Sequence, residues 1–220
     1  MRICGNATTD LISLLKTRWL DLCLNLGADA EIKKGVFNSL VTLYAEPGRA
    51  YHNLKHVYNL LGWAETWREN ILDFQTIGFA VWFHDAIYDA RRVDNEPQSA
   101  NLAVARLKYL KASDAQIETV RQIILATKTH DSTGLNADGR LFLDLDLSIL
   151  GADALAYQAY SRAIRREYDF VSEPLYRTGR QRVLQSFLDR EFIYLTAVCR
   201  EKFELPAREN IKREIVELSK

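Results

Sequence analysis

The side chains best suited to bind a transition metal in this chain are its four histidines, His52, His56, His84 and His130. A neutral imidazole binds a metal without a charge cost. His52 and His56 are four residues apart, a spacing that places two side chains on one face of a helix. This pair is therefore a candidate metal site, although the same spacing also fits a helix cap or a surface pair.

A histidine and an aspartate close the apolar segment 79–83. His84 shares the helical stripe of Ile77 and Val81, so we expect it to face the interior, with Asp85 at the edge of that stripe. A buried carboxylate is costly unless it is paired or binds a metal. The two side chains would thus reach one ion from a helix end, or else form a core histidine beside a surface aspartate.

Two further aspartates, Asp144 and Asp146, lie in the apolar run 141–150. Carboxylates in such surroundings need compensation. A helix cap by Asp144 accounts for one of them. We therefore expect one of the two to point into a polar or metal site. His130, at the end of another helical segment, fits either a helix C-terminus or a contact to an ion or phosphate.

In chain order, His56, the pair His84-Asp85 and the distal Asp146 resemble the HD superfamily of metal-dependent phosphohydrolases. The chain is more closely similar to a bacterial family of predicted HD phosphohydrolases. Matching stretches lie at residues 51–56, 83–89, 95–100, 144–151, 164–168 and 207–210. The resemblance covers about residues 40–215 and implies an all-α fold, an HD-domain-like helical bundle.

The resemblance also implies which residues hold the metal. They are His56, His84, Asp85 and Asp146. Asp144 competes with Asp146 for the distal position. Two imidazoles and two carboxylates suit Mn, Fe, Co, Ni or Zn, with Mg less favoured. Related enzymes with two metals use additional histidines, so we expect one or two ions, with His52 and His130 available to the second.

The expected reaction is hydrolysis of a small phosphate ester, with nucleotides among the candidate substrates, by a metal-activated water. Some HD nucleotidases place a catalytic glutamate shortly after the His-Asp pair. Here Tyr88 and Asp89 occupy that region, and Glu96 is the nearest glutamate downstream. The candidates for catalytic proton transfer are therefore Asp85, Asp89 and Glu96.

Basic side chains near these motifs are candidates for binding the substrate phosphate. The set is His52, Lys55, Lys128, His130 and Arg165. Arginine matches phosphate in bidentate geometry. The alternative is that such arginines are solvated or paired with neighbouring acids, such as Glu167, Asp169 and Glu173.

Two other functions compete with this interpretation. A zinc peptidase would use the two-histidine spacing of His52 and His56, but Asn53 stands where that motif needs its glutamate base. A non-catalytic helical protein that binds a metal or a nucleotide for regulation is the second alternative. Metal content followed by a phosphatase screen separates these functions.

Helical periodicity covers most of the chain and defines the elements that must position these residues. The predicted helices are 10–26, 30–45, 52–70, 72–88, 95–111, 113–129, 153–170, 180–203 and 206–219, and no strand is expected. Ser113 with Gln116 fits a capping box. The expected irregular segments are 47–51, 131–140 and 172–179. We predict one domain over residues 1–220, with a metal-binding core at about 50–150 and helices 153–219 packed on it.

Composition limits the partners. The 220 residues include 29 basic and 29 acidic side chains, and this balance argues against broad binding to DNA, RNA or an anionic membrane. The scattered Cys4, Cys23 and Cys199 suggest neither a disulfide framework nor a cysteine zinc site. Residues 1–6 turn polar too early for a signal peptide, so we expect a cytoplasmic protein. Exposed apolar helix faces would permit a homodimer.

Overall fold

The computed structural model describes residues 4–220, and side chains from residue 9 onward. The expectations for the first residues of the chain and for the Cys4 thiol lie outside these described parts. Within them the protein is all-helical and has no strand, which confirms the predicted all-α class. The first helices are α1 (Cys4–Leu22), α2 (Ala30–Tyr44), α3 (Leu54–Thr66), η1 (Arg68–Asn70), α4 (Phe74–Phe83), α5 (Asn95–Tyr109) and α6 (Asp114–Ala126). They are followed by α7 (Ala137–Asp146), η2 (Leu147–Gly151), α8 (Ala154–Glu167), α9 (Glu173–Leu188) and α10 (Ala197–Leu218).

The chain divides into two compact units, Met1–Phe142 and Leu143–Lys220. The first holds α1 to α6 and most of α7. The second holds the end of α7, η2 and α8 to α10. Because compact units can fold together or separately, the single domain expected above stays a prediction.

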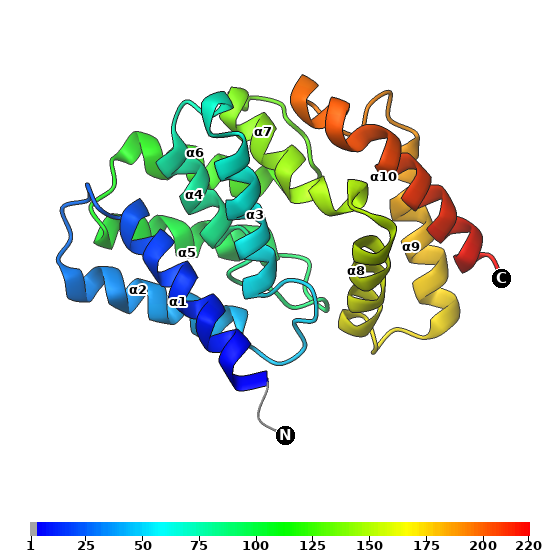
Figure 1. Cartoon of the computed structure of the whole chain (residues 1–220), viewed down its shortest axis with the longest axis horizontal. Helices are drawn as coiled ribbons and strands as arrows, with labels where there is room; N and C mark the ends of the chain where they lie inside the picture. Colours follow the sequence, from blue (N-terminus) through cyan, green and yellow to red (C-terminus); the bar gives the residue numbers. More distant parts are fainter. Residues whose placement is uncertain (1–3) are drawn as a thin grey trace. The chain divides into compact units, whose positions relative to one another are not determined.

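The first unit is built around α4, which has no solvent-exposed face. Every residue from Thr76 to Phe83 is buried. Helix α4 contacts α1, α3, α5 and α6, and Figure 1 shows it between α3 and α6. A helix that is apolar on all sides is stable only in such a position. The ring of Trp82 meets Trp19 of α1 edge to face, with centroids 5.4 Å apart.

Two aspartates fix the start of α4. Asp73 is its N-cap, and the side chain accepts a hydrogen bond from the Thr76 amide at 3.0 Å. The buried Asp138 of α7 accepts from the amides of Leu72 at 2.9 Å and Asp73 at 2.7 Å. These contacts satisfy amides that a helix start leaves without partners, and so they set where α4 begins.

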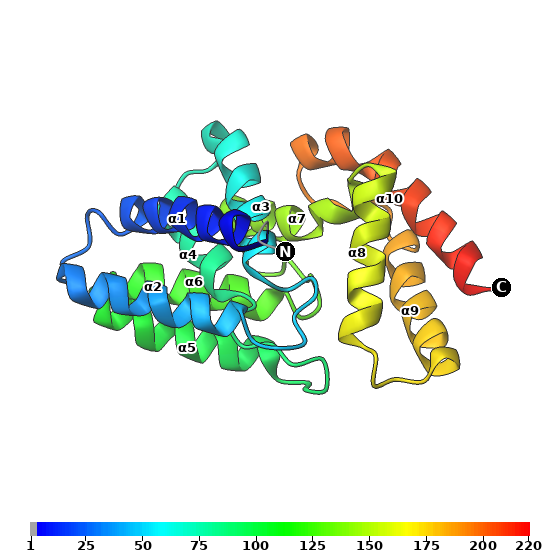
Figure 2. The same ribbon diagram turned by 60° about the horizontal axis from the view of Figure 1, so that its bottom comes forward.

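The second unit is a group of three long helices with η2. Figure 2 shows α8 and α9 as neighbours, and α10 packs on both α9 and η2. A buried ion pair joins α9 to α10, in which Arg180 donates to Glu214 at 2.9 Å. Glu214 also accepts from the hydroxyl groups of Tyr157 and Ser161 in α8. One carboxylate therefore joins all three helices.

The C-terminal helix boundaries differ from the prediction. The predicted helix 180–203 is interrupted, because α9 ends at Leu188 and α10 starts at Ala197. The segment predicted irregular at 172–179 is the beginning of α9, where Pro174 occupies the first turn that tolerates proline. Likewise α7 starts at Ala137, inside the predicted irregular segment 131–140. In contrast, Ser113 caps α6 by accepting from the Gln116 amide, as its capping box predicts.

None of the described helices combines the length and the apolar character that crossing a bilayer requires.

Candidate metal centre

His56 lies in the first turn of α3, and its side chain is 3% exposed. The helix begins there because Asn53 is its N-cap, with a side chain that accepts from the Lys55 amide at 2.9 Å. His52 therefore precedes the helix, and the prediction of a helix from residue 52 with both histidines on one face is wrong. The rings of His52 and His56 have centroids 6.0 Å apart and are steeply inclined. The local reason is that asparagine is a strong N-cap residue.

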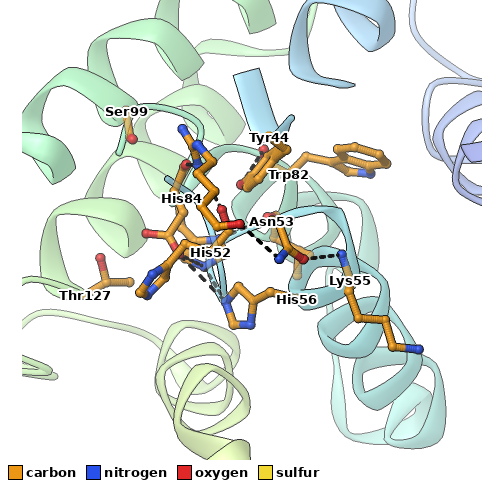
Figure 3. A network of polar contacts seen from close by, with 12 residues as sticks. Tyr44, His52, Asn53, Lys55, His56, Trp82, His84, Ser99 and Thr127 are labelled. Atoms are coloured by element: carbon orange, nitrogen blue, oxygen red, sulfur yellow. Dashed lines mark hydrogen bonds and ion pairs between the residues drawn. The ribbon is translucent and has the colours of Figure 1, made fainter. Parts of the chain in front are cut away.

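His84 is the C-cap of α4 and is the most buried of the candidate ligands, with its side chain 1% exposed. Its Nδ1 lies 3.0 Å from the carbonyl oxygen of Val81. Because a carbonyl only accepts, Nδ1 carries the hydrogen, and the neutral ring keeps its lone pair on Nε2. That Nε2 lies 3.1 Å from Nε2 of His56, and Figure 3 shows the two side chains meeting.

Asp85 completes a triangle of donor atoms inside the first unit. Its Oδ2 lies 3.0 Å from Nε2 of His84 and 3.7 Å from Nε2 of His56. Donor atoms that share one cation through bonds of about 2.1 Å lie about 3 to 4 Å apart, and the three separations here fall in that range. Two imidazole nitrogens and a carboxylate oxygen at these separations form a donor set that suits a divalent cation, and the residues therefore fit a metal.

Asp146, the last residue of α7, belongs to the second compact unit, so its part in the metal site stays a prediction. One turn earlier in α7, Phe142 packs edge to face on the His84 ring, with centroids 5.6 Å apart. His56, His84 and Asp85 are thus close together within the first unit, and this group has the composition of an ion site.

Asp144, the competing candidate, has a different role. Its carboxylate accepts from the amides of Leu195 and Thr196, both at 2.7 Å, and from the Thr196 hydroxyl at 2.6 Å. Burial raises the pKa of Asp144 above its usual 3.8, against the effect of these hydrogen bonds. The Asp144 side chain therefore holds the loop before α10.

Arg49 was not among the residues selected from the sequence, although it lies beside the cluster. Its buried guanidinium donates to the carbonyl oxygens of His52 at 3.1 Å, Asp85 at 2.7 Å and Ala86 at 2.9 Å. The only sequence signal was an arginine three residues before His52, in a turn that also contains Pro47 and Gly48. Such a signal does not reveal which carbonyl groups the side chain reaches.

The turn after Asp85 is held from a second side. The hydroxyl of Ser99, a buried residue of α5 labelled in Figure 3, accepts from the Ile87 amide at 3.0 Å and donates to the Ile87 carbonyl at 3.1 Å. Tyr88 follows in this turn and stacks on His52, with ring centroids 4.1 Å apart. This stack places the His52 ring against the turn that carries Asp85.

The two other predicted acids lie farther along the same connection. Asp89 is exposed, and its side chain accepts from the Arg91 amide at 2.9 Å. Glu96 is in the first turn of α5. Their assignment to proton transfer stays a prediction.

The predicted phosphate-binding residues have varied surroundings. Lys55 is exposed above the Tyr58 ring, and Lys128 donates to the carbonyl of Val93 at 2.6 Å. His130 has a left-handed backbone conformation, with φ of 51°. Arg165 donates to Glu173 at 2.9 Å and to the carbonyl oxygens of Tyr168 and Val171. The guanidinium of Arg165 is thus engaged inside the second unit, and phosphate binding by these residues stays a prediction.

Comparison of the chain with protein-family models, with curated proteins and with solved structures finds no match. The resemblance to the HD superfamily therefore depends on residue types and their order in the sequence.

Proposed function

We propose that the protein is a metal-dependent phosphohydrolase that acts on a small phosphate ester, with His56, His84, Asp85 and Asp146 as the metal ligands. The observation that carries the proposal is the triangle of His56, His84 and Asp85 donor atoms, with separations of 3.1, 3.0 and 3.7 Å. A divalent cation held there would lower the pKa of a water molecule and polarise a phosphoryl oxygen.

The chain itself supplies three properties that this chemistry needs. The hydrogen bond from Nδ1 of His84 to Val81 fixes the tautomer that presents a lone pair to the cation. Both histidines are buried, which keeps their rings from bulk water. The Asp85 side chain is 18% exposed, so we expect a phosphate ester to approach from the side of this carboxylate.

The donor set also limits the metal. Two nitrogen and two oxygen ligands favour Mn, Fe, Co, Ni or Zn over Mg, which prefers oxygen ligands and water. Four protein ligands on a six-coordinate ion leave positions for water and for a phosphate oxygen.

The test is metal analysis of protein purified without chelator, followed by a hydrolysis screen after loading with each of these metals. The screen contains phosphomonoesters, nucleoside mono- and triphosphates and cyclic nucleotides. We expect metal-dependent hydrolysis of at least one class, and His84→Ala and Asp85→Asn should each lower both metal content and kcat/KM by more than 100-fold. Asp114→Asn changes an exposed aspartate at the start of α6 and serves as the matched control, with unchanged activity.

Metal binding without hydrolysis of any compound would replace this proposal with a regulatory metal-binding role. A parent protein that binds no metal would instead give the cluster a packing role.

A further inference from the structure

We infer that Arg49 is a positioning residue for the metal centre, because its guanidinium holds the two ligand-bearing segments at the separation that lets them share a cation. The inference rests on the proposed metal site and adds to it a residue that binds neither metal nor substrate.

The first observation is the burial of a permanent charge. The Arg49 side chain is 2% exposed. A buried cation is costly unless its hydrogen-bonding groups are satisfied. Glu46, one turn earlier in sequence, lies 3.5 Å from a terminal nitrogen but is itself half-exposed. The ion pair with Glu46 alone therefore does not compensate the buried charge of Arg49. The backbone carbonyl groups that accept from its guanidinium must supply the rest of this compensation.

The second observation is where those carbonyl groups lie. His52 is four residues before His56 and directly before the N-cap of α3, while Asp85 and Ala86 directly follow His84. The planar guanidinium thus connects the segment before α3, which leads to His56, with the turn that carries His84 and Asp85. The two shortest hydrogen bonds go to Asp85 and Ala86, at 2.7 and 2.9 Å.

The consequence concerns the direction of the Asp85 carboxylate. Fixing the carbonyl groups of Asp85 and Ala86 restrains the two peptide groups that follow the Cα of Asp85. The orientation of that Cα sets the direction in which the carboxylate leaves the backbone. Metal ligands must be held within about 0.5 Å of their working positions for tight binding. A loosened turn would separate the Asp85 oxygen from the His56 and His84 nitrogens, which now lie within 3.7 Å of it.

Positioning and charge make opposite predictions for Arg49. As a fixed positive charge near a cation site, Arg49 opposes metal binding, so its neutralisation would raise affinity. As a positioning residue Arg49 favours metal binding, so loss of its two donating guanidinium nitrogens would lower the metal affinity. Lysine separates the two effects, because it retains the charge but not the planar pair of donors.

The experiment measures the dissociation constants of Co²⁺ and Zn²⁺ by chelator competition for the parent, Arg49→Lys and Arg49→Met. The Co²⁺ absorption spectrum reports ligand geometry, and thermal unfolding of the metal-free proteins reports folding. We expect 10- to 100-fold weaker binding in both variants, with a changed Co²⁺ spectrum, as for other residues that orient metal ligands. Arg121→Lys is the control, since Arg121 also uses two guanidinium nitrogens, but its partner is the Glu118 carboxylate on the exposed surface of α6.

Parent-like affinity in Arg49→Lys, or tighter binding in Arg49→Met, would overturn the inference whatever the enzymatic activity. Weaker binding in the variants of a parent that hydrolyses no ester would support the inference and refute the proposed enzyme. A parent that binds neither metal would refute both.

A second measurement needs no variant, and it decides the matter if the variants do not fold. In protein labelled with ¹⁵N-arginine, the terminal nitrogens of Arg49 should show slow rotation about the Nε–Cζ and Cζ–N bonds, with resonances that shift on Zn²⁺ addition. A rapidly rotating guanidinium that is indifferent to Zn²⁺ would exclude the positioning role.

Discussion

Asp138 and Asp144 of α7 make the same contact with different helices. Each is buried, and each accepts hydrogen bonds from two consecutive backbone amides just before a helix starts. Asp138 does so before α4 and Asp144 before α10. Asp146, two residues after Asp144, is the aspartate proposed as a metal ligand. The same short helix therefore carries two carboxylates that bind the amides before helix starts and one carboxylate that is proposed to bind a metal.

The first prediction separates these roles with the same substitution at two positions. Asp144→Asn places an amide group opposite amide donors, and should lower the free energy of unfolding by about 2–3 kcal/mol while the folded protein keeps its metal affinity. Asp146→Asn should weaken metal binding at least 10-fold with little loss of stability in the metal-free protein. Urea unfolding and chelator competition measure the two effects. The reverse pattern would make Asp144 the ligand.

The second prediction concerns acid stability. Burial raises the pKa of Glu214, but the hydrogen bonds and charge of Arg180, with the hydroxyls of Tyr157 and Ser161, outweigh it and leave the pKa below its usual 4.5. A lowered pKa in the folded state means that the stabilisation is complete above pH 4.5 and is lost as the pH falls through the folded value. Urea unfolding between pH 6 and pH 3 should therefore show a decline that is shallower in Glu214→Gln.

The control for this pair is Glu217→Gln, which changes an exposed glutamate on the same helix and should keep the parent slope. At neutral pH, Arg180→Met leaves a buried carboxylate without its cation and should cost about 3–5 kcal/mol. A parent-like pH profile in Glu214→Gln would show that other carboxylates control acid unfolding.

A third prediction follows from the contact of η2 with α10. A Cβ added at Gly151 would lie 2.8 Å from the carbonyl oxygen of Phe203 and 2.9 Å from its Cα, and backbone atoms cannot rotate away. Gly151→Ala should therefore destabilise the protein by about 1–3 kcal/mol. Gly179→Ala is the matched control, because nothing lies within 4 Å of its added Cβ. In helix α9, that change should stabilise by about 0.5–1 kcal/mol in the same thermal or urea unfolding assay.

The fourth prediction concerns the two described cysteines. Cys23 and Cys199 are fully buried, and burial raises the pKa of each thiol to about 12. Because the thiolate is the reactive form, iodoacetamide at pH 8 should leave both unmodified in the native protein and alkylate both in guanidinium chloride. Peptide mapping by mass spectrometry distinguishes these sites. Native labelling at the rate of a free cysteine peptide would reveal local opening.

The sequence predicted the site best where the relevant interactions are local. His84 and Asp85 follow an apolar segment whose periodicity predicts a buried helix, and the structure places them at the end of that helix. The position of His52 inside a helix was mispredicted because α3 starts two residues later, at Leu54, and periodicity does not locate a helix start that closely. The asparagine between the histidines was a usable signal, since asparagine is a frequent N-cap.

Other features depend on residues far apart in the chain. The apolar loop between α9 and α10 resembles a helix in sequence, but its amides bind the carboxylates of Glu204 and Asp144 instead of helical carbonyl groups. The sequence left open whether Asp144 or Asp146 is the distal metal ligand, because the hydrogen bonds from this loop to Asp144 are tertiary contacts. The contacts of Arg49 are likewise tertiary, and no pattern of types or spacing displays them.

The absence of a polar face on α4 also affects the chain before it folds. Residues 74–83 contain no charge, and a stretch of this composition is prone to aggregate when exposed. The aspartates at its two ends, Asp73 and Asp85, are the charges that discourage such association in the newly made polypeptide. The carboxylate proposed to bind a metal thus also protects the nascent chain, so neutral variants at position 85 should give lower refolding yields at high protein concentration.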